Sequence, residues 1–312
     1  MSVKIFDRPD VQDFLKVLSG LANDSGNPRV KQIIHRLMSD LFKAIDDLDI
    51  TPDEYWTAIA WVNEIGAAGQ AGLISPGLGL DHFLDERLDA IDDALGIKNE
   101  TPRTIEGPLY VAGAPVSQGF ARLDDGTDAN GHTLIMQGTV YGADGKPLPG
   151  ASVEVWHCDT RGFYSHFDPT GKQAPFNMRR TIIADVNGCY KFRSIVPHGY
   201  GVPPGSPTEK LLSALGRHGQ RPAHIHFFIS ADDHRKLTTQ INIAGDPLVN
   251  DDFAYATRDG LVPEVTERTD EASIRANDLS GPFAEIEFDF RLTALVNGVD
   301  NQVNEQRKRA AA

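Results

Sequence analysis

Two histidines, His224 and His226, lie two residues apart in the apolar stretch RPAHIHFF. Successive side chains of a β-strand point to opposite faces, so a strand here carries both imidazoles and Phe228 on one face. The opposite face then carries the apolar side chains of Ala223, Ile225 and Phe227. Two imidazoles on one face of a strand form half of a metal site, but they are equally compatible with two ordinary surface histidines. A metal site requires further ligands, so their presence elsewhere in the sequence would distinguish it from a pair of surface histidines.

The usual partners of a two-histidine metal site are missing near this strand. A cupin site would supply a carboxylate shortly after the second histidine, but here the positions hold Ile229, Ser230 and Ala231. The sequence also contains no HExxH motif and no CxxC pair, which counts against the common zinc sites. The same lack of a carboxylate disfavours the ferrous two-histidine, one-carboxylate site of extradiol enzymes.

Two tyrosines are candidates for the remaining ligands. Tyr200 lies between glycines in VPHGYGVPPG, which predicts a loop, and Tyr164 follows the strand-like VEVWHCD in the loop TRGFYSHF. A phenolate is a hard anionic donor that favours ferric over ferrous iron, and a strong cation is needed to ionise a phenol at neutral pH. Each tyrosine could instead be half-buried with its hydroxyl bonded to water.

The elements that position these residues fall into two compositional parts. Residues 1–104 predict helices: an apolar stripe follows Asn27 and Pro28 and extends from Val30 to Leu48, and Thr51-Pro52-Asp53-Glu54 forms a capping box. A third helix is expected in DHFLDERLDAIDDALG, whereas AGLISPGLGLD looks too rich in glycine and proline to be regular.

Residues 105–296 predict an antiparallel β-sandwich. Strands are expected over 132–141 and 151–158, on both sides of Asn187-Gly188, in LTTQIN and in FAEIEFDFRLTAL. The fold class is therefore α+β, with a helical N-terminal region, a β-sandwich domain and a C-terminal tail over 297–312.

Composition excludes several classes of function. The net charge of −14 disfavours a nucleic-acid partner, and the basic cluster Arg307-Lys308-Arg309 is expected to be a solvated end. No signal peptide or membrane span is expected, and two cysteines without a CxxC pair suit a cytoplasmic protein with free thiols.

Long, ordered motifs identify a family resemblance. They are TPRTIEGPLYVAGAP (101–115), GTVYGADGKPLPGASVEVWHCDTRGFY (138–164), IVPHGYG (195–201), LGRHGQRPAHIHFFIS (215–230), LTTQIN (237–242) and DDFAYATRDGL (251–261). With them the chain resembles the intradiol ring-cleaving dioxygenases, most closely the catechol 1,2-dioxygenases. The resemblance implies cleavage of catechol by O2 to cis,cis-muconate, a step of aromatic degradation in the β-ketoadipate pathway.

The resemblance also implies which residues carry the chemistry. One non-haem Fe(III) per subunit is held by Tyr164, Tyr200, His224 and His226, and Tyr200 leaves the metal when catechol binds. Arg221 stabilises negative charge on the substrate, although an arginine in an acidic protein usually forms a structural ion pair. Gln240 is expected either in the pocket or in a purely structural role.

The substrate pocket carried over from the family is mostly apolar, as suits a flat aromatic ring. Its residues are Leu73, Pro76, Ile105, Gly107, Pro108, Leu109, Arg221, Phe253 and Ala254. Relatives that prefer hydroxyquinol tend to carry an acidic group at the position of Leu73, so leucine predicts a preference for catechol and methylcatechols. Where the family usually has a small residue after its Trp-His pair, this chain has Cys158, which should fit as a small hydrophobe.

The resemblance gives the N-terminal helices a second task, a homodimer interface with a phospholipid in an apolar tunnel. The stripe from Val30 to Leu48 could equally be ordinary core. The main alternative to an enzyme is a non-catalytic transthyretin-like sandwich, which GTVYGADGKPLPGASVEVW also resembles. Such a module would not need both tyrosines and both histidines. A related intradiol enzyme for chlorocatechol or hydroxyquinol is the second alternative.

Overall fold

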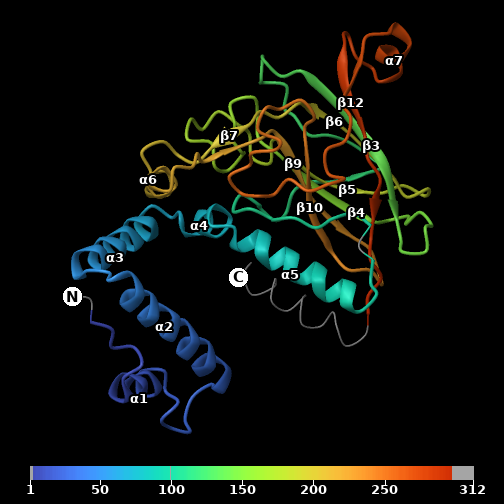
Figure 1. The fold of residues 1–312 in the computed structure, drawn as a ribbon. Coiled ribbons are helices and arrows are strands. Elements are labelled where there is room, and N and C mark those ends of the chain that lie inside the picture. Colours follow the sequence, from blue (N-terminus) through green and yellow to red (C-terminus); the bar gives the residue numbers. More distant parts are fainter. Residues whose placement is uncertain (1–2, 99, 297–312) are drawn as a thin grey trace. The chain divides into compact units, whose positions relative to one another are not determined.

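The computed structural model describes residues 3–98 and 100–296, so the expected tail over 297–312 lies outside the described residues. Packing divides the chain into two units, one ending at Ala68 and one starting at Gly69. The change in sequence composition expected at residues 104 and 105 therefore comes later in the chain than the division drawn from packing. The two units are described separately below (Figure 1).

The first unit consists of helices α1 (Pro9–Leu18), α2 (Pro28–Leu48) and α3 (Pro52–Ala67). The predicted starts of α2 and α3 are confirmed. The Asn27 side chain accepts hydrogen bonds from the backbone N–H groups of Arg29 and Val30, and Thr51 and Glu54 form the reciprocal capping box. The apolar stripe of α2 remains exposed, from 40% at Ile34 to 73% at Leu48. Helix α1 was not predicted.

The second unit begins with helices α4 (Ala71–Gly77) and α5 (Leu80–Ala94). Helix α4 corrects the expectation that AGLISPGLGLD is irregular. Its Pro76 lies in the last turn, where it removes one helical hydrogen bond, and the left-handed Gly79 (φ 73°) follows the helix end. Gly72 lies within this helix and packs closely against Pro108, since a Cβ built there would lie 3.3 Å from Cβ of Pro108. None of the helices in residues 3–98 and 100–296 combines the length and apolar character required to cross a membrane.

Two sheets make up most of the second unit (Figure 1). The five-stranded sheet has the order β1-β5-β4-β9-β10, and the six-stranded sheet has the order β11-β12-β3-β6-β2, with β13 added to β3. The strands are β1 (Val116–Gln118), β2 (Phe120–Arg122), β3 (Thr133–Tyr141), β4 (Ser152–Trp156), β5 (Arg179–Ile183), β6 (Cys189–Ile195), β9 (His224–Ser230), β10 (Leu237–Asn242), β11 (Thr266–Arg268), β12 (Phe283–Glu287) and β13 (Phe290–Arg291).

The remaining elements are two short strands and two short helices. Strands β7 (Tyr200–Gly201) and β8 (Gln220–Arg221) pair with each other, and α6 (Pro207–Ala214) lies between them in sequence. Helix α7 (Glu271–Ala276) precedes β12. The expected continuous strand over 283–295 is interrupted, because β12 ends at Glu287 and β13 begins at Phe290.

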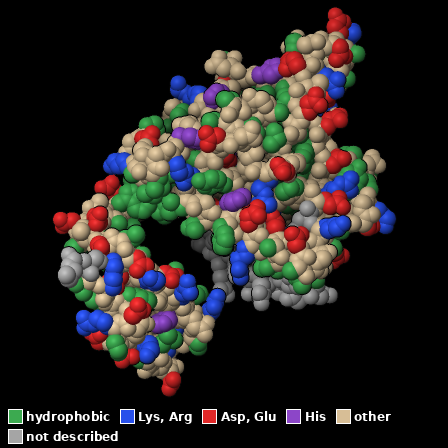
Figure 2. Space-filling view, in the orientation of Figure 1, with side chains coloured by type: hydrophobic (Ala, Val, Ile, Leu, Met, Phe, Trp, Pro, Cys, Tyr) green, Lys and Arg blue, Asp and Glu red, His purple; other side chains and the backbone are tan. Residues whose placement is uncertain are grey.

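The two sheets form the expected sandwich around one apolar core. Val153, Ile225 and Phe227 from the five-stranded sheet share a buried cluster with Leu134 and Phe192 from the six-stranded sheet. The pairing is mixed rather than purely antiparallel. The central pairs are antiparallel, but β1 pairs with β5, β2 with β6 and β12 with β3 in parallel, because these strands do not follow one another through hairpins. On the face shown in Figure 2, Lys and Arg side chains are interspersed with Asp and Glu.

Candidate active site

Strand β9 presents its two histidines on the side facing away from the core. Ile225 and Phe227 lie in the core cluster, whereas His224 and His226 are buried on the opposite face, as alternation predicts. Trp156 on β4 and Gln240 on β10 lie directly opposite His226, so all three share one face of the sheet. The Trp156 and His226 rings stack with centroids 5.0 Å apart and planes 7° apart, which fixes the imidazole.

Nε2 of His224 is the atom around which the polar groups gather. Nδ1 of His224 lies 2.7 Å from the Pro222 carbonyl oxygen, which can only accept, so Nδ1 carries the proton and Nε2 presents a lone pair. Nε2 of His226 lies 3.1 Å away. Burial, reinforced by Arg221, lowers the pKa of His224 to about 3, and burial together with His224 holds the pKa of His226 well below its ordinary value. Both imidazoles are therefore neutral at physiological pH, the form in which histidine binds metals.

The two tyrosine hydroxyls reach the same place. Oη of Tyr164 lies 3.3 Å from Nε2 of His224, and Oη of Tyr200 lies 3.4 Å from Oη of Tyr164 and 3.5 Å from Nε2 of His224. Tyr164 is 1% exposed, whereas Tyr200 is only partly buried. Burial raises the pKa of both phenols; the neighbouring Tyr200 raises that of Tyr164 further, and Arg221 partly offsets the rise at Tyr200. These phenols ionise only against a strong cation.

The backbone at Tyr200 is not the loop that its flanking glycines suggested. Tyr200 belongs to β7 and lies opposite Arg221 of β8. A Cβ built at Gly199 would lie 2.7 Å from the Arg221 carbonyl oxygen, and one at Gly201 would lie 2.3 Å from the Gln220 side chain. The glycines therefore permit close approach of two chain segments rather than a free loop.

Arg221 links this cluster to a buried polar network. Its Nη1 donates to Nε2 of His224 at 3.1 Å, and its Nη2 donates to Oε1 of Gln240 at 2.8 Å. Asp252 accepts from Nε and Nη2 of Arg221, both at 3.1 Å, and from the backbone N–H of Ala254 at 3.0 Å. The structure thus brings Arg221 and Gln240 to the site, as predicted. Sequence reasoning missed Asp252, although it lies in the quoted motif DDFAYATRDGL.

The expected pocket residues gather in two apolar groups. Ile105, Phe253 and Ala254 share a buried cluster against which Leu73 packs, and Leu109 packs with Trp156, Tyr164 and Phe228. Gly107 lies beside His226, since a Cβ built there would meet Cε1 of that ring at 3.6 Å. Pro76 is buried in α4, and Pro108 lies against Gly72 of the same helix. Gly107 and Leu109 thus contact rings of the His–Tyr cluster.

The four donors fit a bound iron ion. Two imidazole nitrogens and two phenol oxygens lie 3.1–3.5 Å from their neighbours in a buried place. The neutral phenols can hydrogen-bond within this cluster, whereas the ionised phenols and the two imidazoles would together offer four lone pairs to one cation. Phenolate oxygens favour ferric iron. Within the part of the chain that the structure describes, no group of three or more His, Cys, Asp and Glu is placed to hold a metal. The tyrosines therefore define this site.

Two protein-family profiles together match most of the chain. Residues 105–294 match the profile described as "Dioxygenase", and residues 27–96 match "Catechol dioxygenase N terminus". The two profiles divide the chain much as its composition does, into a helical N-terminal region and a β-rich domain. The match of the β-rich domain to a dioxygenase profile argues against the alternative of a non-catalytic transthyretin-like sandwich.

Similar proteins agree with both profiles. A catechol 1,2-dioxygenase of Acinetobacter baylyi is 68% identical over 303 residues, 97% of each chain. The structure of the catechol 1,2-dioxygenase from Acinetobacter sp. ADP1 inhibited by bound mercury superimposes with a TM-score of 0.94, at 68% identity, covering 96% of this chain and 97% of that one. The enzyme from Pseudomonas arvilla C-1 gives a TM-score of 0.90 at 54% identity, with 96% of each chain covered. The chain therefore belongs to the catechol 1,2-dioxygenases, a family of iron-dependent intradiol ring-cleaving dioxygenases.

Proposed function

We propose that the chain cleaves catechol with O2 between its two hydroxylated carbons, giving cis,cis-muconate with both oxygen atoms incorporated. This reaction belongs to the degradation of aromatic compounds through the β-ketoadipate pathway. The observation that carries the proposal is the convergence of two phenols and two imidazoles within 3.1–3.5 Å in a buried site. Membership of the catechol 1,2-dioxygenase family supports the same reaction.

One ferric ion per chain would be held by Tyr164, Tyr200, His224 and His226. When bound, it supplies the charge that ionises both phenols and a centre that chelates the substrate as a dianion, drawing electron density from the ring. Burial raises the pKa of both phenols, so each would ionise only against the charge of the metal, and Tyr200 would hold a proton once it left the metal. Tyr200, the more exposed of the two, would be the one to give way to substrate.

The chain's own residues then handle the protons and the charge of the substrate. As a phenolate, Tyr200 would accept one of the two catechol protons, and the second would leave to solvent. Arg221 is 4% exposed and cannot lose its proton, so its guanidinium remains a fixed positive charge beside His224 as negative charge develops on the ring. Gln240 accepts from Nη2 of Arg221 and helps to hold the guanidinium plane in place.

The apolar groups on either side select the flat ring and exclude water. Ile105, Phe253, Ala254 and Leu73 form one wall, and Leu109 forms part of the other. Leu73 offers no hydrogen bond to a third hydroxyl, so hydroxyquinol would bury an unpaired polar group there. Catechol and methylcatechols are therefore the preferred substrates.

The visible absorption spectrum of the iron-loaded protein tests this proposal. A broad tyrosinate-to-iron charge-transfer band is expected, which moves to longer wavelength when catechol is added without oxygen. Oxygen should then restore the first spectrum and release cis,cis-muconate. Tyr164→Phe and Tyr200→Phe should each alter the band, whereas Tyr141→Phe, on β3, is the matched control that should not. A colourless protein with a full complement of iron would overturn the two-tyrosinate site.

We further propose a homodimer formed by the N-terminal helices, with a phospholipid between them. The exposed stripe of α2 supports this, because Val30, Ile33, Ile34, Leu37 and Leu41 are each 40–57% exposed in the single chain. Sedimentation at micromolar concentration should give a dimer, and Leu37→Glu should shift it toward monomer. A monomeric wild-type protein would contradict the interface. Mass spectrometry of an organic extract tests the lipid.

A cytoplasmic location completes the proposal. Within the described residues, Cys158 and Cys189 are both free thiols, which suits a reducing compartment. Cell fractionation with cytoplasmic and periplasmic marker enzymes tests it, and recovery with the periplasmic marker would contradict it.

A further inference from the structure

The backbone on both sides of Tyr164 is held by side chains from elsewhere in the fold. On the N-terminal side, the Phe163 N–H donates to Oδ1 of Asp159 at 3.0 Å, and the Phe163 carbonyl accepts from Nε2 of Gln173 at 2.9 Å. On the C-terminal side, the Ser165 carbonyl accepts from Nη2 of Arg179 at 3.1 Å, and the Ser165 hydroxyl donates to the Asn177 carbonyl at 2.7 Å and accepts from Nε of Arg179 at 2.9 Å. Tyr164 thus lies between two anchored residues.

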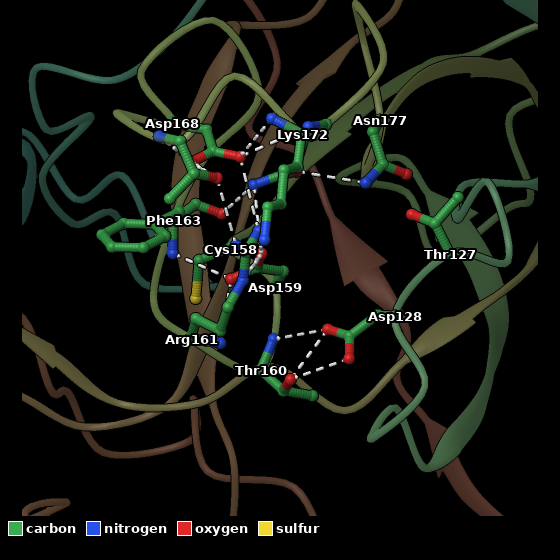
Figure 3. Close-up of polar contacts among 12 residues, drawn as sticks. Thr127, Asp128, Cys158, Asp159, Thr160, Arg161, Phe163, Asp168, Lys172 and Asn177 are labelled. Carbon is green, nitrogen blue, oxygen red and sulfur yellow. Dashed lines mark hydrogen bonds and ion pairs between the residues drawn. The ribbon is translucent and has the colours of Figure 1, made fainter.

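Asp159 is the centre of the N-terminal anchor (Figure 3). The residue is 2% exposed, and its carboxylate accepts five hydrogen bonds. Oδ1 accepts from the backbone N–H groups of Arg161 and Phe163, at 2.9 and 3.0 Å. Oδ2 accepts from Nε and Nη2 of Arg161, at 2.9 and 2.6 Å, and from Nε2 of Gln173 at 3.2 Å. A backbone bond from Asp159 N–H to the Phe163 carbonyl, 2.9 Å, closes the turn.

Two further carboxylates hold the same segment in place (Figure 3). Asp128, which comes from before β3, accepts from the backbone N–H of Thr160 at 3.0 Å and from its hydroxyl. Asp168 lies 3.4 Å from Nη2 of Arg161. The segment from residue 159 to residue 163 is therefore fixed at both ends, and the Asp159 carboxylate bonds both to its backbone and to the Arg161 side chain.

The turn that Asp159 closes also touches the second tyrosine. Gly162 has a left-handed backbone (φ 80°), and a Cβ built on it would lie 2.6 Å from Cβ of Tyr200. A side chain cannot be accommodated there, so the Asp159 turn rests directly on Tyr200. The position of the turn consequently affects both phenols whose hydroxyls lie 3.4 Å apart.

We propose that Asp159 is a positioning residue of the metal centre. Its buried carboxylate fixes the position of the Tyr164 phenol through the backbone of Phe163, and that of the Tyr200 phenol through Gly162. It touches neither substrate nor metal. The inference rests on the proposed function, since it concerns the tyrosines assigned there as ligands. Outer partners of this kind typically change metal affinity or activity by roughly 10- to 100-fold when they are substituted.

The test compares Asp159→Asn with Arg161→Gln and with a matched control. Asparagine keeps the size of the side chain but loses the charge and one acceptor oxygen. Arg161, 38% exposed at its side chain, can be replaced with little risk to folding. The control is Asp92→Asn on α5, a carboxylate as deeply buried as Asp159 (3% exposed), which pairs with Arg103 and Arg235. Thermal midpoint, charge-transfer band and rate of iron loss to a chelator are measured for each.

Asp159→Asn should move the charge-transfer band and speed iron loss by roughly tenfold or more, and Arg161→Gln should cause a smaller change of the same kind. Asp92→Asn should lower the thermal midpoint while leaving the band and iron loss as in the wild type. If both Asp159→Asn and Arg161→Gln match Asp92→Asn in band position and iron loss, Asp159 is purely structural and the inference fails. Should Asp159→Asn not fold, Arg161→Gln decides alone. A wild-type protein without the band would instead refute the proposed function.

Discussion

Arg221 and Asp252 form a buried bidentate ion pair that joins the guanidinium beside His224 to the backbone of Ala254, a proposed pocket residue. Nε and Nη2 of Arg221 lie 3.1 Å from Oδ1 and Oδ2 of Asp252, and Oδ1 also accepts from the backbone N–H of Ala254. Burial by itself would raise the pKa of Asp252, but the Arg221 charge outweighs it, so the pKa is lowered and the pair stays ionised. One carboxylate therefore orients both a guanidinium and a pocket residue.

Replacing Asp252 by asparagine should let the Arg221 guanidinium shift and should lower kcat/KM by about a hundredfold. A displacement of about 1 Å in a group that stabilises the transition state typically reduces the rate by that factor. The charge-transfer band should stay near its wild-type position, because the four ligand residues are untouched. Steady-state kinetics and the spectrum measured on one preparation check both expectations. Glu285→Gln, which breaks an ion pair with Arg268 on the six-stranded sheet, is the control. Unchanged kinetics in Asp252→Asn would contradict the positioning role.

Leu73 should set the preference for catechol over hydroxyquinol. The wild-type protein should turn over hydroxyquinol poorly, and Leu73→Asp should raise the hydroxyquinol-to-catechol ratio of kcat/KM by roughly tenfold or more, since an acidic group can pair with the third hydroxyl. Leu73→Asn is the control, because asparagine has the size of aspartate but no charge, and it shows whether polarity alone changes the preference. Comparable turnover of both substrates by the wild type would show that Leu73 does not select.

Acid should destabilise the protein partly through His157. Nδ1 of His157 donates to the Cys158 carbonyl and Nε2 accepts from the Ser194 hydroxyl, both at 2.7 Å, so the ring is buried in its neutral form. Burial lowers its pKa to about 4. Because the folded-state pKa lies below the unfolded value near 6.5, this contribution to stability is complete above pH 6.5 and is lost as pH falls toward 4.

At about 1.4 kcal/mol per pKa unit, the interval from 6.5 to about 4 amounts to about 3 kcal/mol. His157→Gln keeps a donor for the carbonyl and an acceptor for the hydroxyl but does not titrate. The free energy of unfolding, measured with urea from pH 7 to pH 4.5, should fall less steeply for this variant than for the wild type. Parallel curves for the two proteins would rule out the assignment.

Cys158 should be chemically inert in the folded protein, although it shares a buried cluster with Tyr164. It is fully buried, its thiol donates to the His198 carbonyl at 3.2 Å, and burial raises its pKa to about 12, so the reactive thiolate is scarce at neutral pH. Iodoacetamide should label Cys189, which is partly exposed, well before Cys158. Peptide mass mapping after timed labelling checks the order, and Cys158→Ala should retain the charge-transfer band. Equal labelling of both thiols would mean that the Tyr164 segment opens.

Local signals in the sequence determined several elements correctly. The Asn27 cap, the Thr51–Glu54 box and the alternation of His224 and His226 each depend on a few neighbouring residues, and the structure contains all three. The type and order of the candidate ligands were also readable, because the family motifs preserve them along the chain. These signals all depend on residues that are close together both in the sequence and in space.

Only the tertiary structure decided the relationships between distant segments. The sheets are mixed, and Tyr200 lies in a short strand against Arg221. Most of AGLISPGLGLD forms α4 despite the low helix propensity of glycine, and its Gly72 packs closely against Pro108. The roles of Asp159 and Asp252 were equally hidden, since a carboxylate on a loop normally faces water. What makes each of them a buried positioning group is the set of cations and N–H donors that folding brings around it.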